Sequence, residues 1–170
     1  LAGFEDAIHH WRSSHGEDYP QYAAGEVDRI ADNLLLYQRA DGGWLQNQDP
    51  TRILGETERA QIAAQAGDTG GSFDNRNIHT QVDYLAAAWA IRGDPRYRDG
   101  SRRGLEFILA QQIGSCGGWP HTVPARASYH PHITFADDVM SGVLGTLRKV
   151  LDDQPRYAFI DADLRARVQA

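Results

Sequence analysis

Two acidic pairs in this sequence have the residue types and the placement needed to bind a divalent cation. Asp74-Asn75 and Asp137-Asp138 each stand where a polar loop passes into a segment with helical periodicity. Side-chain oxygens at such places commonly cap backbone N–H groups, and carboxylates suit the positive end of the helix dipole. Carboxylate and amide oxygens are also the hard ligands that calcium prefers. We therefore predict either helix capping or a shared calcium site that leaves room for carboxylates of a ligand.

Other polar side chains downstream suggest two further sites. His121, His130 and His132 could form a zinc site, but a Pro-rich loop lacks the i, i+4 spacing that orients two imidazoles on a helix. We favour solvated loop histidines over zinc. Arg126, in the stretch Pro124-Ala125-Arg126, could clamp a carboxylate through two N–H groups. A surface ion pair accounts for this arginine equally well.

Gly-Gly-Trp occurs twice, each time after a segment with helical periodicity, and ends at Trp44 and at Trp119. A glycine there can supply the left-handed residue that ends a helix, while the indole packs over the helix end. An indole in a loop can also be a platform on which a sugar ring stacks. The two roles are compatible, and we predict packing with stacking as the alternative.

Four segments have the apolar spacing of helices and must position these side chains. They are residues 21–39, 77–92, 95–112 and 136–152. No window of comparable length alternates with period two, so we predict an all-α fold. Long Gly-, Pro- and Asp-rich connections at residues 40–53, 67–76 and 114–135 separate the helices, and connections of this length usually carry function.

The chain is also similar to itself, which predicts repeated helix pairs. Gln38 to Trp44 is echoed by Gln112 and residues 117–119, and Asp94-Pro95-Arg96-Tyr97 returns 60 positions later as Gln154-Pro155-Arg156-Tyr157. These echoes divide the chain into repeats at about 21–92 and 95–153, with a third beginning at about 155. An open stack of repeats leaves an apolar flank uncovered. We therefore expect residues 1–170 to be one partial domain, an incomplete (α/α) toroid.

The toroid gives the acidic pairs a common location. Its helices alternate in direction, so loops that follow helices of the same direction lie at the same end. Asp74-Asn75 and Asp137-Asp138 occupy equivalent places in their repeats. The two pairs should therefore converge on one rim.

Composition excludes several classes of function. The formal net charge is −6 and the 17 Lys and Arg residues are scattered, which argues against nucleic-acid binding. No apolar run approaches the roughly 20 residues of a membrane-spanning helix. The only cysteine, Cys116, cannot form a disulfide or a cysteine-based zinc site within the chain. The chain begins at Leu1 without an initiator Met or a signal peptide, so we expect an excised or processed piece. We also expect a monomer.

Five stretches, taken in order, resemble the pectate lyases of polysaccharide lyase family ten. They are Ile30-Ala31-Asp32-Asn33-Leu34-Leu35-Leu36-Tyr37-Gln38, Gly42-Gly43-Trp44, Phe73-Asp74-Asn75 with Thr80-Gln81, Gly117-Gly118-Trp119-Pro120, and Ile133-Thr134-Phe135-Ala136-Asp137-Asp138-Val139-Met140. The resemblance covers roughly residues 23–151. Motifs in family order with plausible spacing are far more specific than any one of them.

The resemblance implies an (α/α) toroid whose cleft degrades polygalacturonate by calcium-dependent β-elimination. It implies Asp137 as a calcium ligand, joined by Asp74, and a catalytic set of Asp74, Asn75 and Asp137. Arg126 matches a Pro-x-Arg position of the family, and we expect it to contact substrate together with Asp138. Trp44 and Trp119 complete the expected substrate-binding set.

Family members take the C5 proton with an arginine, whose motif we expect beyond Ala170, so no base is assigned to this chain. The sequence also departs from the family at Leu45 and Gln46, which replace Pro and Lys, and at Ala136, which replaces Asn. These changes affect the expected subsites. Because pectin lies outside the cell, the resemblance further implies a secreted or periplasmic protein.

Two other classes of protein fit part of the pattern. A uronate-binding module without catalysis would keep the acidic rim and lack the arginine base. A terpenoid-cyclase-like toroid is suggested by the spacing of Gln38, Asp41 and Trp44. Such proteins line an apolar central cavity with aromatic side chains, whereas the loops here are polar and only 9% of residues are aromatic. The cyclase is therefore disfavoured.

Overall fold

The computed structural model describes residues 1, 3–114 and 117–170, so Cys116 lies outside the described residues. In this part of the chain the elements are α1 (Glu5–His15), α2 (Val27–Tyr37), α3 (Glu56–Ala63), β1 (Gly71–Ser72), α4 (His79–Arg92), α5 (Pro95–Ala110), β2 (Thr122–Val123), α6 (Val139–Leu151), the 3-10 turn η1 (Pro155–Tyr157) and α7 (Ala162–Gln169). The predicted all-α fold is confirmed. Within these ranges, no helix combines the length and apolar character required to cross a bilayer.

The helices with a strong apolar stripe lie where the sequence predicts them. α4, α5 and α6 begin and end within three residues of the expected bounds. α2 begins later than expected, at Val27, because the residues before it are extended: Gln21 forms an isolated bridge with Arg52, and the backbone N–H of Tyr22 donates to Thr51. Pairing with a distant segment therefore overrides the local helical pattern.

Three helices were not predicted, and each buries little. Ala7 is the buried residue of α1, Leu164 that of α7, and α3 buries none. Apolar periodicity reports burial on one face of a helix. Helices that lie on the surface therefore leave no such signal in the sequence.

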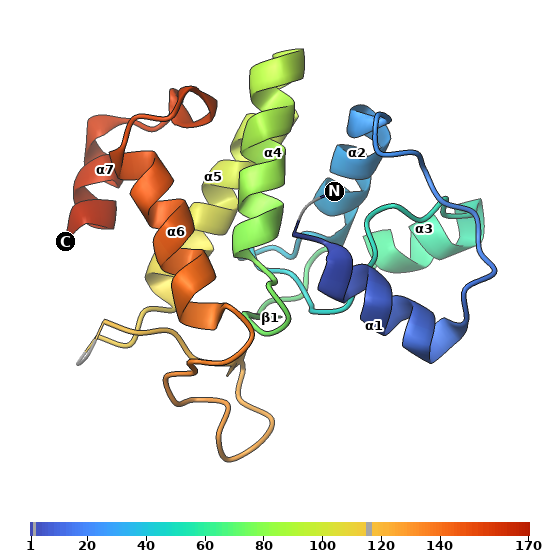
Figure 1. Cartoon of the computed structure of the whole chain (residues 1–170), viewed down its shortest axis with the longest axis horizontal. Helices are drawn as coiled ribbons and strands as arrows, with labels where there is room; N and C mark the ends of the chain where they lie inside the picture. The colour runs from blue at the N-terminus through green and yellow to red at the C-terminus, as the bar shows by residue number, and fades with distance from the viewer. Residues whose placement is uncertain (2, 115–116) are drawn as a thin grey trace.

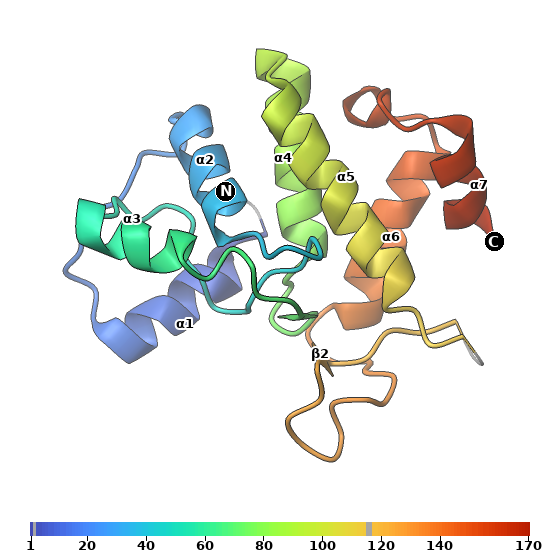
Figure 2. The ribbon, with the colours of Figure 1, turned by 180° about the vertical axis from the view of Figure 1, so that it is seen from behind.

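The helices form layers around one core (Figures 1 and 2). α4 and α5 pack along each other, α2 lies against both, α6 packs on the other flank of α4, and α7 covers α6. Asp94 starts α5 by accepting a hydrogen bond from the backbone N–H of Arg96 at 2.9 Å, and Pro95 occupies the first turn. Fully buried apolar side chains from the three central helices include Val82, Leu85, Leu105, Ile108, Val143 and Val150.

A two-stranded antiparallel sheet ties the long loops together below the helices. β1 pairs with β2 so that Gly71 faces Val123 and Ser72 faces Thr122. The strands approach closely at Gly70, which has φ +93° and whose added Cβ would lie 2.3 Å from the carbonyl oxygen of Val123. Only glycine fits there. The sheet therefore fixes the first acidic loop, residues 71–78, against the loop that follows the second Gly-Gly-Trp. We call residues 133–138 the second acidic loop.

Candidate functional site

The two Gly-Gly-Trp motifs have the same internal geometry. The indole N–H of Trp44 donates to the carbonyl of Leu34 at 2.8 Å, and that of Trp119 donates to Ile108 at 2.8 Å. Each tryptophan thereby adds a second donor to a carbonyl near the end of the preceding helix, beside the backbone N–H of Gln38 in the first motif and of Gln111 in the second. Both indoles are 1% exposed.

This burial corrects one prediction. A sugar cannot stack on an indole that the core covers, so Trp44 and Trp119 pack and do not bind substrate directly. The glycines also differ from the expected helix caps. Gly42, with φ +93°, and Gly117, with φ +71°, are left-handed but stand beyond the C-cap residues Gln38 and Gln111.

The glutamine that precedes each Gly-Gly-Trp motif makes the same hydrogen bond in both places. Nε2 of Gln38 donates to the carbonyl of Gly42 at 3.1 Å, and Nε2 of Gln112 donates to Gly117 at 3.0 Å. In both repeats an amide side chain thus closes the turn that delivers the tryptophan to the core.

Asp74 lies in the first acidic loop, two residues after β1. The backbone N–H of Phe73 donates to the carbonyl of His121 at 2.9 Å, which extends the β1–β2 contact up to Asp74. The Asp74 carboxylate lies 3.3 Å from Nε2 of His121 and accepts a hydrogen bond from Nε2 of Gln46 at 3.2 Å. Its side chain is only 14% exposed. α4 begins five residues later, so Asp74 is not the helix cap that local sequence allowed.

A cavity of ≈ 400 Å³ opens beside Asp74. Arg126, Tyr129 and His130 line it together with His121. The structure therefore brings Asp74 and Arg126, two predicted site residues, to one cavity.

The three histidines of this loop, His121, His130 and His132, do not gather around one point as ligands of a metal ion would. The rings of His121 and His130 stack with centroids 4.8 Å apart, and Nδ1 of His130 pairs with the backbone N–H of Arg126 at 3.0 Å. His132 is exposed. Among residues 1, 3–114 and 117–170, no three His, Cys, Asp or Glu side chains gather as a metal cluster.

The second acidic loop meets the first, as the repeat predicts. The backbone N–H of Arg76 donates to the carbonyl of Asp137 at 3.2 Å, and Nε of Arg76 lies 3.4 Å from the Asp138 carboxylate. The two loops therefore meet as predicted, but Asp74 and Asp138 line different cavities. Asp137 and Asp138 are both exposed. Asp138 is the N-cap residue of α6, but its side chain makes no capping bond and accepts a hydrogen bond from Ser141 instead.

Left-handed backbone is concentrated in these two loops. Asn75, Arg76, Ile78, Asp137 and Asp138 all have φ between 51° and 69°. Such conformations are costly for residues other than glycine and cluster at functional sites. The amide of Asn75 donates to Oδ1 of Asn47 at 2.8 Å, which braces the first loop against the Gly-Gly-Trp turn.

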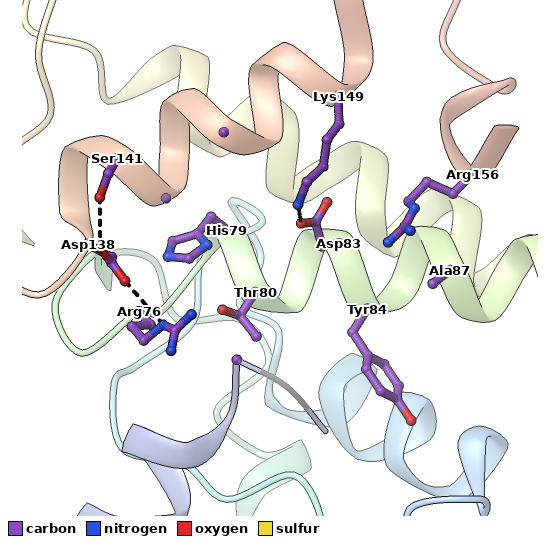
Figure 3. Close-up of a pocket in the computed structure, with 13 residues that line it drawn as sticks. Arg76, His79, Thr80, Asp83, Tyr84, Ala87, Asp138, Ser141, Lys149 and Arg156 are labelled. Carbon is purple, nitrogen blue, oxygen red and sulfur yellow. Dashed lines mark hydrogen bonds and ion pairs between the residues drawn. The ribbon is translucent and has the colours of Figure 1, made fainter. Parts of the chain in front are cut away.

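A second cavity of ≈ 480 Å³, which the sequence did not reveal, lies between α4 and α6 (Figure 3). Asp83 on α4 pairs there with Lys149 on α6 and also accepts a hydrogen bond from Tyr157. Asp138 and Arg76 close the end of this cavity nearest the acidic loops.

His79 is a buried wall of the second cavity. Its side chain is 7% exposed, and burial lowers the pKa of His79 to about 4. The imidazole lies against α6 at Gly142, where an added Cβ would stand 2.1 Å from Nε2. His79 is therefore neutral at pH 7 and serves as a packing element between the two helices.

The oxygen donors at the meeting point of the loops fit calcium in kind. Asp137 offers an exposed carboxylate. One oxygen of the neighbouring Asp138 carboxylate is paired with the guanidinium group of Arg76. Asp74 is already held by His121 and Gln46, which disfavours it as a direct ligand. Calcium takes six to eight oxygens and accepts water and ligand carboxylates among them. The exposed carboxylates at this point are therefore of a chemical type that calcium accepts.

The packed helices and the long polar loops that join them define an (α/α) toroid fold. The chain belongs to the pectic acid lyase family, because the sequence pattern of that family matches residues 38–170. The resemblance seen in the sequence motifs is thus confirmed. No curated protein sequence matches the chain.

Two solved structures share the fold. One is a family 10 polysaccharide lyase from Cellvibrio cellulosa, 24% identical with a TM-score of 0.71, and it matches 99% of this chain and 47% of its own. The other is an aspartate-to-alanine mutant of a family 10 lyase from the same organism in complex with trigalacturonic acid, 24% identical with a TM-score of 0.72 over 98% and 47%. The chain thus spans about half the length of these enzymes.

Proposed function

We propose that the chain forms the acidic rim of a pectate lyase that cleaves polygalacturonate by calcium-assisted β-elimination. The observation that carries this proposal is the contact between Arg76 and Asp137, which joins the two acidic loops of successive repeats. Family membership supports the reaction class. The trigalacturonic acid bound to the related mutant supports a uronate substrate.

In the proposed reaction, the chain's own residues bind and orient the uronate. Asp137, with Asp138 beside it, would hold the calcium ion. Bound calcium would withdraw charge from the substrate carboxylate and so make the neighbouring C5 proton more acidic. Arg126 would bind a second carboxylate through its guanidinium group. Asp74 and Asn75 would fix the shape of the first loop, because both are held by side-chain hydrogen bonds.

We assign no residue of this chain to proton abstraction from C5. Two cations near the acidic loops are already engaged with carboxylates, because Arg76 lies beside Asp138 and Lys149 pairs with Asp83. Because the substrate is a polymer outside the cell, we also propose that the protein is exported.

The test is isothermal titration of trigalacturonate into the chain with and without calcium. Asp137→Ala should weaken the calcium-dependent binding at least about tenfold, since it removes an ionised ligand. Asp163→Ala is the matched control, because Asp163 is an exposed carboxylate on α7, away from the rim. Equal calcium-dependent affinities for the wild type and a folded Asp137→Ala variant would remove Asp137 from the site.

A uronate-binding module without catalysis remains the second candidate. The interaction between Gln46 and Asp74 favours it, because Gln46 stands where the resemblance predicts a lysine and occupies one side of the carboxylate. The two candidates differ in product. A lyase that contains this chain releases unsaturated uronides, which absorb ultraviolet light, whereas a binding module releases none.

A further inference from the structure

The burial of both tryptophans leaves the site without the aromatic platform that the sequence suggested. Tyr129, in the loop between β2 and α6, has the opposite character. It is 57% exposed, although it sits in a cluster of aromatic rings. An exposed ring that the surrounding loop holds in place can stack on a ligand at little conformational cost.

The geometry of the cluster shows how Tyr129 packs against the two imidazoles. The parallel imidazoles of His121 and His130 are 4.8 Å apart, a spacing too small for a third ring between them. The Tyr129 ring is perpendicular to both, at 5.2 Å from His121 and 4.6 Å from His130. Tyr129 therefore packs beside the imidazole pair and not between its members, and 57% of the residue stays exposed.

The backbone holds this arrangement in place. The N–H of His121 donates to the carbonyl of His130 at 2.9 Å, and the N–H of His132 donates to the carbonyl of Tyr129 at 3.1 Å. The Asp74 carboxylate lies 3.3 Å from Nε2 of the same His121. The ring cluster is thus anchored to the first acidic loop.

Tyr129 and Arg126 line the same cavity of ≈ 400 Å³, a size within the usual range for small-ligand sites. Arg126 is exposed. A uronic acid has an apolar ring face of C–H groups and a carboxylate at its edge. An aromatic face beside a guanidinium group offers a complement to both parts.

We propose that Tyr129 is the stacking platform for one uronate ring and that Arg126 binds the carboxylate of the same ring. The identity of the sugar rests on the proposed function. Calcium is not needed for this contact, so the platform is a subsite separate from the Asp137 rim. It holds the polymer beside the acidic loops without taking part in the chemistry.

Calorimetry with trigalacturonate and calcium gives the first test. Tyr129→Ala should weaken binding about tenfold, whereas Tyr129→Phe, which keeps the ring, should stay within about twofold. Ile91→Ala is a matched control, because Ile91 is 66% exposed near the far end of α4. Wild-type affinity in a folded Tyr129→Ala variant would overturn the proposal.

Saturation-transfer NMR on the same chain separates this proposal from the lyase proposal. With galacturonate in excess and calcium removed, irradiation of the aromatic protons should transfer saturation to the sugar C–H protons in the wild type and in Asp137→Ala. The transfer should be lost in Tyr129→Ala. Absence of this transfer from the wild type would exclude the Tyr129 platform. If Asp137→Ala loses only the calcium-dependent affinity, the result concerns the proposed calcium site and leaves the platform unaffected.

Discussion

The two acidic loops, residues 71–78 before α4 and residues 133–138 before α6, begin from similar motifs and differ in exposure. In the first loop Asp74 is 14% exposed and is held by His121 and Gln46. In the second loop Asp137 is exposed, and its backbone carbonyl makes the contact with the first loop. The first loop is a braced support, and the second presents its carboxylate to solvent.

This difference shows which part of the repeat is structural. Both tryptophans donate to a helix carbonyl 10 or 11 residues earlier, so the packing half of the unit is the same in the two copies. The side chains of Asp74 and Asp137, in the two acidic loops, share no hydrogen-bond pattern of this kind. The side chains at the loops can therefore take different roles in the two copies of the repeat, while the packing of the core beneath them stays the same.

One pair of equivalent positions differs because the two residues touch. Asp137 follows Asp74 by 63 residues, and Gly142 follows His79 by the same 63. The imidazole of His79 occupies the space into which a side chain at Gly142 would extend. The large residue in one repeat thus requires the small residue in the next.

The largest expected effect tests the part that the two repeats share. Trp44→Ala and Trp119→Ala should each lower the free energy of unfolding by about 3–5 kcal/mol, because each removes a fully buried indole together with its hydrogen bond to a helix carbonyl. Urea unfolding followed by circular dichroism measures this. Trp89→Ala is the control, since Trp89 is only partly buried and should cost less. A small loss at either motif would show that the two copies are not equivalent.

His79 gives the first repeat a pH dependence that Gly142 cannot give the second. Burial lowers the pKa of His79 from 6.5 to about 4, so the unfolded chain binds the proton first as the pH falls. The stabilisation is complete above pH 6.5 and is lost between pH 6.5 and 4, by about 3 kcal/mol in total. Urea unfolding at pH 7 and at pH 4 should show this loss.

The control is the same comparison on two variants. His79→Gln should reduce the loss of stability between pH 7 and 4, while His132→Gln, at an exposed histidine, should leave it unchanged. Identical pH profiles for the wild type and His79→Gln would mean that the imidazole is not buried as a neutral group.

Local periodicity and the repeat were sufficient to predict the central helices and the meeting of the acidic loops. The apolar stripes of α4 and α6 located those helices, and the equivalence of the acidic pairs placed their loops together. The sequence could not predict that Asp74 is held by His121, because that contact depends on the pairing of β1 with β2 across a long stretch of chain. The burial of Trp44 was likewise open, since a loop motif does not reveal whether its indole faces the core or solvent.

The smallest effect concerns the glycines of α6 and sharpens the comparison between His79 and Gly142. Gly142→Ala should lower the free energy of unfolding by about 1–3 kcal/mol, because the new methyl group would overlap the imidazole. Gly145→Ala is the matched substitution one turn later, where an added Cβ meets nothing within 4 Å. It should raise stability by about 0.4–1 kcal/mol, since alanine loses less backbone entropy on folding.

A double-mutant cycle identifies the cause of the loss at Gly142. If His79 is the obstacle, Gly142→Ala should cost much less in a His79→Ala background than in the wild type, because the two substitutions share one space. Additive losses of stability would place the obstacle elsewhere on α4. The fit between successive repeats would then depend on other contacts of that helix.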